Sequence, residues 1–236
     1  MDGRRRSQLW IRAGLLGLPL YGLLTLWSAR EPQPDPDSQY DAWARFVTTP
    51  EYVLTHVLGS GLGLILAIFG TFALGAYLAG GRAGSLALTA MTTTVLGTSL
   101  FLFAGGVSAF ASPQEGQAHL AGVEGYDELP DSYASDAFAL VGLTSVVLSF
   151  VGNVLLGAAV WRSRTLPRWA GVLWLAAAVL MYPLGIVVAA VSTGSTPPTV
   201  LVGAALVAVA GGWIAWSATD RRRAAVGSSP SSAAHR

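Results

Sequence analysis

Cysteine and lysine are both absent from the 236 residues of this chain. Without a thiol, the chain has no disulfide, thiolate metal site, thiol nucleophile or cysteine-linked lipid. Without a lysine, it cannot hold retinal or any other cofactor through a Schiff base. All 14 Lys and Arg positions are therefore arginine. This arginine-rich, lysine-free composition leads us to expect a bacterial protein.

Charge is scarce as well. Only 11% of the residues are charged, whereas soluble domains carry charge at about a quarter of their positions. Hydrophobic residues make up 53% of the chain, and the formal net charge is +1. The composition therefore indicates a membrane protein, and it gives no electrostatic reason to expect nucleic acid as a partner.

Long apolar runs are abundant. A helix that crosses a bilayer needs about 20 mostly apolar residues. Six stretches reach that length, at residues 9–27, 52–79, 84–112, 137–161, 169–192 and 199–219. We predict an all-α polytopic membrane bundle of six transmembrane helices within residues 9–219. A basic N-terminus at residues 1–8 precedes it, and a disordered tail rich in Ser, Ala and Gly at residues 220–236 follows it.

The charges alternate between successive loops. Arginines gather before the first run, after the second, after the fourth and after the sixth, at positions 4–6, 82, 162, 164, 168 and 221–223. The other loops hold eleven acids and only Arg30 and Arg45. By the positive-inside rule, this alternation predicts that both termini are cytoplasmic, in a bacterial plasma membrane.

Small residues recur at helical spacing in two of the runs. Gly59, Gly63 and Gly75 share one face of the second run, and Gly157 lies on such a face in the fourth. Helices in lipid associate by close packing, so we expect these faces to contact neighbouring helices. Leucine at Gly63 should disrupt that packing.

A few polar side chains fall inside the apolar runs. Asn153 is the only carboxamide deep in a run, and the hydroxyl-rich third run offers Thr94 and Thr98 as partners. These residues either make structural hydrogen bonds between helices or line a polar pathway. Tyr182, beside the helix-breaking Pro183, is a further residue that can line a cavity.

The histidines offer one weak metal pattern. His56 falls near the outer end of the second run, His119 is predicted in the loop after the third run, and Glu51 is close to His56 in sequence. Nitrogen and oxygen ligands of this kind can hold a divalent metal, and two histidines can hold a haem. The alternative is that His56 simply bonds a backbone carbonyl. We therefore predict no cofactor and keep metal or haem as the alternative.

The turn between the fourth and fifth runs resembles a turn found in other membrane proteins. Its sequence RSRTLPRWAGVL, residues 162–173, resembles a basic turn with Leu-Pro-Arg that opens a Gly-containing helix in uncharacterised six-helix multi-pass membrane protein families of actinobacteria and other bacteria. The resemblance covers roughly the last three helices. It implies a multi-pass fold, and it carries no catalytic residue because those families have no assigned activity.

Three functions fit these observations. The first is a non-enzymatic accessory, scaffold or sensor component that acts with a membrane protein partner or as a homo-oligomer. The second is a small-solute facilitator using a cavity between the second, third, fourth and fifth helices. The third is a redox subunit that holds a metal or haem. The runs lack a deep carboxylate or arginine, which disfavours ion-coupled transport, and no hydrolase or nucleotide-binding motif is present.

Overall fold

A computed structural model describes residues 3–30, 33–123, 133–191 and 196–227 of the chain, without the side chains of residues 3–5, 133–135 and 221–227. These residues form helices and connecting turns, with no strand among them. The helices are α1 (Gly3–Leu15), α2 (Gly17–Ser28), α3 (Tyr40–Val47), α4 (Pro50–Leu54), the π-helix η1 (Thr55–Leu62), α5 (Gly63–Leu78), α6 (Gly84–Leu120), α7 (Tyr133–Ser163), α8 (Arg168–Met181), α9 (Pro183–Val191) and α10 (Pro198–Gly227).

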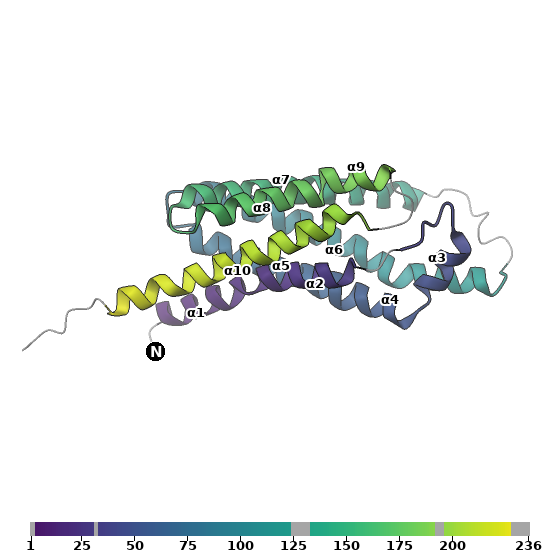
Figure 1. Ribbon diagram of the computed structural model, residues 1–236, viewed down its shortest axis with the longest axis horizontal. Helices are drawn as coiled ribbons and strands as arrows, with labels where there is room; N and C mark the ends of the chain where they lie inside the picture. Colours follow the sequence, from purple (N-terminus) through teal and green to yellow (C-terminus); the bar gives the residue numbers. More distant parts are fainter. Residues whose placement is uncertain (1–2, 31–32, 124–132, 192–195, 228–236) are drawn as a thin grey trace, which may run out of the picture.

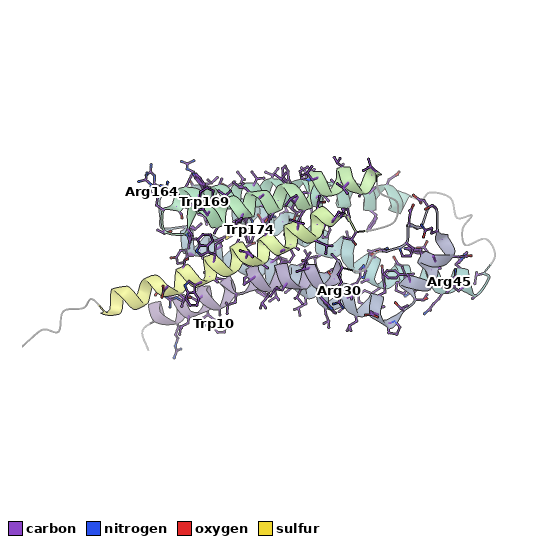
Figure 2. All side chains as sticks on the ribbon, in the orientation of Figure 1. Trp10, Arg30, Arg45, Arg164, Trp169 and Trp174 are labelled. Atoms are coloured by element: carbon purple, nitrogen blue, oxygen red, sulfur yellow. The ribbon has the colours of Figure 1, made fainter. Side chains whose placement is uncertain are left out.

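Within the described residues, six helical segments are long and apolar enough to cross a membrane, which confirms the predicted number of spans. They are Arg6–Ser28, Pro50–Leu78, Gly84–Leu120, Asp136–Ser163, Arg168–Val191 and Pro198–Asp220. The start of α1 and the end of α10 lie at the same end of the bundle (Figure 1). We call this the termini end, and the other the loop end. Arg164 and Trp169 lie at the termini end, and Arg45 lies at the loop end (Figure 2).

The six spans form a closed ring in which each packs against its neighbours in sequence. The α1–α2 span packs on η1 and α5, α5 on α6, α6 on α7, α7 on α8, and α8 on α10. The ring closes because α10 returns to pack on α2.

The two halves of the ring differ in packing. In the half toward the termini end, buried side chains from all six spans fill the centre, among them Leu18, Leu74, Leu156, Trp174 and Ile214. In the half toward the loop end, the centre is hollow. A separate small core there, formed by Trp43, Ala44, Val47 and Tyr52, joins α3 to the start of the second span.

Three spans are interrupted within their length. The first breaks at Leu16, because Pro19 has no N–H to bond the carbonyl four residues earlier. Pro183 has the same effect in the fifth span, so α8 ends at Met181 and Tyr182 departs from helical geometry with ψ −83°. The second span begins at Thr49, whose side chain accepts from the backbone N–H of Tyr52 at 3.2 Å, and passes from α4 into η1.

The third helix is longer than the sequence predicts. We expected it to end at residue 112, yet α6 runs through Pro113 to Leu120. The extra turns pack on the unpredicted helix α3: a side chain at Gly116 would meet the carbonyl of Ala44 at 2.9 Å. The apolar run marks only the part of the helix that would face lipid. The helix itself continues as far as α3 packs against it. His119 therefore lies on α6, not in a loop as predicted.

The chain also departs from the predicted boundary at its end. We expected a disordered tail from residue 220, but α10 continues to Gly227. The rest of the predicted tail, 228–236, lies outside the described residues.

Glycines allow close approach at several helix crossings. A Cβ at Gly152 on α7 would lie 2.5 Å from the backbone nitrogen of Thr94 on α6, and one at Gly97 would lie 2.8 Å from the Ser149 hydroxyl. Of the four predicted packing glycines, Gly59 faces Ser28 of α2, Gly75 faces Met91, and Gly157 faces the carbonyl of Gly171.

Gly63 is the looser member of that set. A Cβ there would lie 3.5 Å from the Leu24 Cβ, which is an ordinary contact. Alanine fits at this position, and only a longer side chain such as leucine should force the helices apart.

Candidate functional site

The hollow half of the ring encloses a central cavity of about 310 Å³. Its wall brings together hydroxyl, imidazole and amide side chains, so we take it as the candidate site. All six spans contribute to its wall, together with Phe46 of α3. The lining is Tyr21, Thr25, Ser28, Ala29, Gln33, Phe46, Thr55, His56, Ser60, Leu64, Thr98, Phe101, Val146, Ser149, Met181, Tyr182, Ile186, Thr196 and Val200. This volume falls at the lower end of the range of about 300–1,000 Å³ for small-molecule sites.

A cluster of hydroxyl groups lies on the cavity wall. The side chains of Tyr21 and Thr25 on α2 are close to that of Tyr182, and Tyr182 is also close to Ser149 on α7. Tyr182 reaches the cavity because the helix breaks at that residue, which confirms the sequence-based expectation for it. Three spans that are distant in sequence therefore contribute to one hydroxyl cluster.

The glycine crossing of α6 and α7 positions part of that cluster. Ser149 and Thr98 are almost fully buried, yet both line the cavity, because Gly97 brings the two helices together beside them. Thr94 lies one turn deeper on α6 than Thr98. Its hydroxyl is buried with no hydrogen-bond partner among the described residues.

His56 contributes the only imidazole of the cavity wall in the described residues. Its Nδ1 lies 2.9 Å from the Tyr52 carbonyl, and its ring lies against that of Tyr52 with the centroids 3.9 Å apart and the planes tilted by 33°. A carbonyl only accepts hydrogen bonds, so Nδ1 carries the proton and Nε2 of the neutral ring is an acceptor. Thr55, His56 and Ser60 all lie on η1, and π-helical segments are frequent at functional sites.

No Asp, Glu, Lys or Arg is among the described residues that line the cavity. Placing an ion in a low-dielectric site without a counter-charge costs several kcal/mol, and in practice such groups are paired or neutralised. The hydroxyls, the imidazole and the amide of Gln33 both donate and accept hydrogen bonds. The lining therefore suits an uncharged molecule with hydrogen-bonding groups.

The cavity has a closed floor. One turn nearer the termini end, the same helices bury Leu18, Ala67, Thr94 and Ala178, and below them the packed core fills the ring. At the loop end the wall reaches the connecting residues Gln33 and Thr196. In this conformation the cavity is a one-ended site.

Asn153 lies beneath the floor. We had suggested the threonines of α6 as its partners, but it bonds other residues. Its Nδ2 donates to the Ser149 carbonyl at 2.8 Å, and its Oδ1 accepts from the indole Nε1 of Trp174 on α8 at 2.9 Å. The bond between helices exists, but its partner is an indole. Tryptophan is easily overlooked as a partner because sequence patterns record it as an apolar residue.

The three residues of the predicted metal pattern lie in different surroundings. His56 faces the cavity, Glu51 is exposed in the first turn of α4, and the Nε2 of His119 donates to Asp41 Oδ1 at 2.6 Å. No group of three His, Asp or Glu able to hold a metal occurs among the described residues.

The His119–Asp41 pair instead joins α6 to α3. The hydrogen bond from His119, with its positive charge when protonated, holds the pKa of the Asp41 carboxyl below its ordinary value. Beside it, the Tyr40 hydroxyl donates to Glu115 at 3.0 Å. These bonds hold α3, and hence Phe46, against the rim of the cavity.

No known protein family, curated protein or solved structure matches this chain.

Proposed function

We propose that this chain is a non-enzymatic membrane protein that binds a small uncharged molecule in the central cavity and acts as a sensor or accessory component for a membrane partner. The observation that carries the proposal is the cavity itself, with the hydroxyls of Tyr21, Tyr182 and Ser149 on its wall above a packed floor. Hydrogen-bonding groups surrounded by apolar walls are typical of ligand sites.

The chemistry of the wall favours binding over catalysis. Hydrolytic and transfer enzymes need a nucleophile with an adjacent base, or paired acids and bases. Here the one imidazole bonds the backbone of its own helix, and the neighbouring groups are neutral hydroxyls.

We further propose that the termini end faces the cytoplasm of a bacterial cell. The two turns at that end carry four arginines, Arg82, Arg162, Arg164 and Arg168. The loop end carries acids, namely Asp35, Asp37, Asp41, Glu51 and Glu115. A C-terminal reporter that fluoresces only in the cytoplasm tests this orientation. A fluorescent fusion supports it, and a dark fusion that is nevertheless inserted and full-length contradicts it.

The binding proposal is tested by thermal unfolding of the purified protein in mild detergent with 1-hexanol, phenol and hexanoate as probes. We expect a saturable rise in the unfolding midpoint with at least one uncharged probe and none with hexanoate, because a ligand that binds only the folded state stabilises it. Thr98→Phe, which fills the cavity, should abolish the rise. Leu96→Phe, on the exposed face of the same helix, should retain it.

Flat responses to all the probes, or equal responses in both variants, would contradict the proposal.

A second function, that of a small-solute facilitator, is favoured by one observation. Two of the spans that line the cavity contain a proline break, at Leu16 and at Tyr182, and broken helices form the central sites of many transporters. Flux of glycerol into proteoliposomes, abolished by Thr98→Phe, would favour the facilitator over the sensor.

A further inference from the structure

The central cavity has an incomplete wall between α7 and α9. At the loop end, α9 packs on α8 and α10, and no comparable packing joins it to α7 in the described residues. Elsewhere around this half of the ring, neighbouring spans pack on one another. We call the line between α7 and α9 the seam.

The side chains along the seam are exposed or only partly buried. Ile186 of α9 lines the cavity and is 55% exposed. On α7, Phe138, Gly142 and Val146 follow one another at four-residue spacing, so they share one helix face. Val146 lines the cavity, a Cβ at Gly142 would meet no atom within 4 Å, and Phe138 is exposed. The cavity face of α7 therefore continues outward without a covering helix.

In a bilayer the seam would face lipid, because it lies between two apolar spans. Both helices lie inside segments that are long and apolar enough to span a membrane, Asp136–Ser163 and Arg168–Val191. The nine residues of α9 extend about 13 Å, at about 1.5 Å a residue, which is close to one leaflet of a hydrocarbon core about 30 Å thick. The opening thus connects the cavity to the leaflet on the loop-end side.

The cavity and its seam together have the polarity of an amphiphile. Tyr182, Tyr21 and Ser149 provide uncharged hydrogen-bonding groups at the deep end. Ile186, Val146 and Phe138 provide an apolar path from there to the lipid. The absence of a charged side chain from the described lining disfavours phosphate, carboxylate and ammonium head groups.

We infer that the ligand of the cavity is a membrane-dissolved amphiphile with one uncharged hydrogen-bonding head and one apolar chain, and that it enters through the seam. The head bonds the hydroxyls around Tyr182, and the chain lies between α7 and α9. This inference rests on the proposed binding function, whose ligand class and route of entry it names.

The test uses the full chain in lipid nanodiscs and a hexadecan-1-ol probe that carries a photoreactive diazirine in its chain. Labelled residues are mapped by peptide mass spectrometry, with and without excess unlabelled hexadecan-1-ol. We expect saturable labelling of α7 around Val146 and of α9 around Ile186. Competition should reduce it at least tenfold, and hexadecanoate at pH 8 should compete much more weakly.

Two tryptophan variants on adjacent positions of α9 give the control. Ile186→Trp fills the mouth of the seam and should reduce the labelling by tenfold or more. Val187→Trp adds the same bulk to an exposed residue that does not line the cavity, and should leave the labelling unchanged. Comparable labelling in the two variants, or labelling spread evenly over all lipid-exposed helices, would overturn the inference.

The outcome also separates this inference from the function on which it rests. If 1-hexanol or phenol stabilises the protein but the long-chain probe does not label the seam, the cavity binds a water-soluble molecule and only the inference fails. If neither short nor long probes bind, both fail.

Discussion

Two glycines on α7 allow a sharp test of what holds the ring together. Gly152 and Gly142 lie on the same helix, but a Cβ at Gly152 would lie 2.5 Å from the Thr94 nitrogen and 2.7 Å from the Thr94 Cα. A Cβ at Gly142 would meet nothing within 4 Å. The same substitution, glycine to alanine, should therefore have opposite effects at the two sites.

The magnitudes follow from two opposing effects. Alanine in place of glycine favours a helix by about 0.8–1 kcal/mol, so Gly142→Ala should stabilise by up to about 1 kcal/mol. At Gly152, the methyl group would contact backbone atoms, which cannot rotate away. Overpacking of this kind costs about 1–3 kcal/mol, and the rigid contact favours the upper value. Net of the helix gain, Gly152→Ala should destabilise by roughly 2 kcal/mol.

The assay is reversible unfolding in mixed micelles, with the mole fraction of a denaturing detergent as the variable. The two free energies of unfolding should differ by roughly 3 kcal/mol, with wild type between them. A shift of the same sign in both variants, or a difference below about 1 kcal/mol, would refute the conclusion that close approach at Gly152 limits the α6–α7 crossing.

Three other outcomes follow from the packing and the bonds. In a double-mutant cycle of Trp174→Phe and Asn153→Leu, the coupling free energy should be about 0.6 kcal/mol, a usual value for hydrogen bonds between membrane helices, and a coupling of zero would show that the bond adds no stability. Gly75→Ala should lower the unfolding midpoint because the added methyl would meet the Met91 Cβ at 2.9 Å; an unchanged midpoint would show that the methionine moves aside. The hydrogen bond to His119 lowers the pKa of Asp41 in the folded chain. The ionised Asp41 carboxylate should therefore stabilise α3 at any pH above the ordinary Asp pKa of about 3.9. This stabilisation should be lost as the pH falls through the lowered pKa of the folded chain. The protection of the amides of residues 40–47, measured as exchange relative to the unfolded chain at the same pH, should then fall on acidification in wild type. In Asp41→Asn the protection should be lower throughout and show no such step; identical profiles would exclude this role.

The sequence predicts the spans well because each is a property of about twenty residues. Hydropathy averaged over a run is little affected by any single contact, so the six apolar segments agree with prediction to within a few residues, apart from the extension of α6. The capping by Thr49 is likewise predictable, since it depends only on neighbours in the chain.

Features that depend on contacts between distant residues could not be predicted. Helix α3 has only eight residues, and it buries Trp43 and Val47 against the end of α6, which itself continues only because α3 covers it. The partner of Asn153 was missed for the same reason, since no spacing rule relates it to an indole 21 residues away. Tyr182 could be found because a neighbouring proline exposes it. Its contacts with Tyr21 and Ser149 require the ring to close.

The split of the ring into a packed half and a hollow half has a consequence for divergence and engineering. Residues that fold the molecule, such as Leu74, Trp174 and Ile214, lie in one half, and residues that would contact a ligand, such as Ser60, Thr98 and Ile186, lie in the other. Under the proposed function, substitutions at cavity residues away from the α6–α7 crossing, such as Ser60 and Ile186, would change ligand preference with little loss of stability. Related chains could therefore keep the packed half unchanged and differ only in a few side chains around the cavity, which under the proposed function would suit them to different molecules.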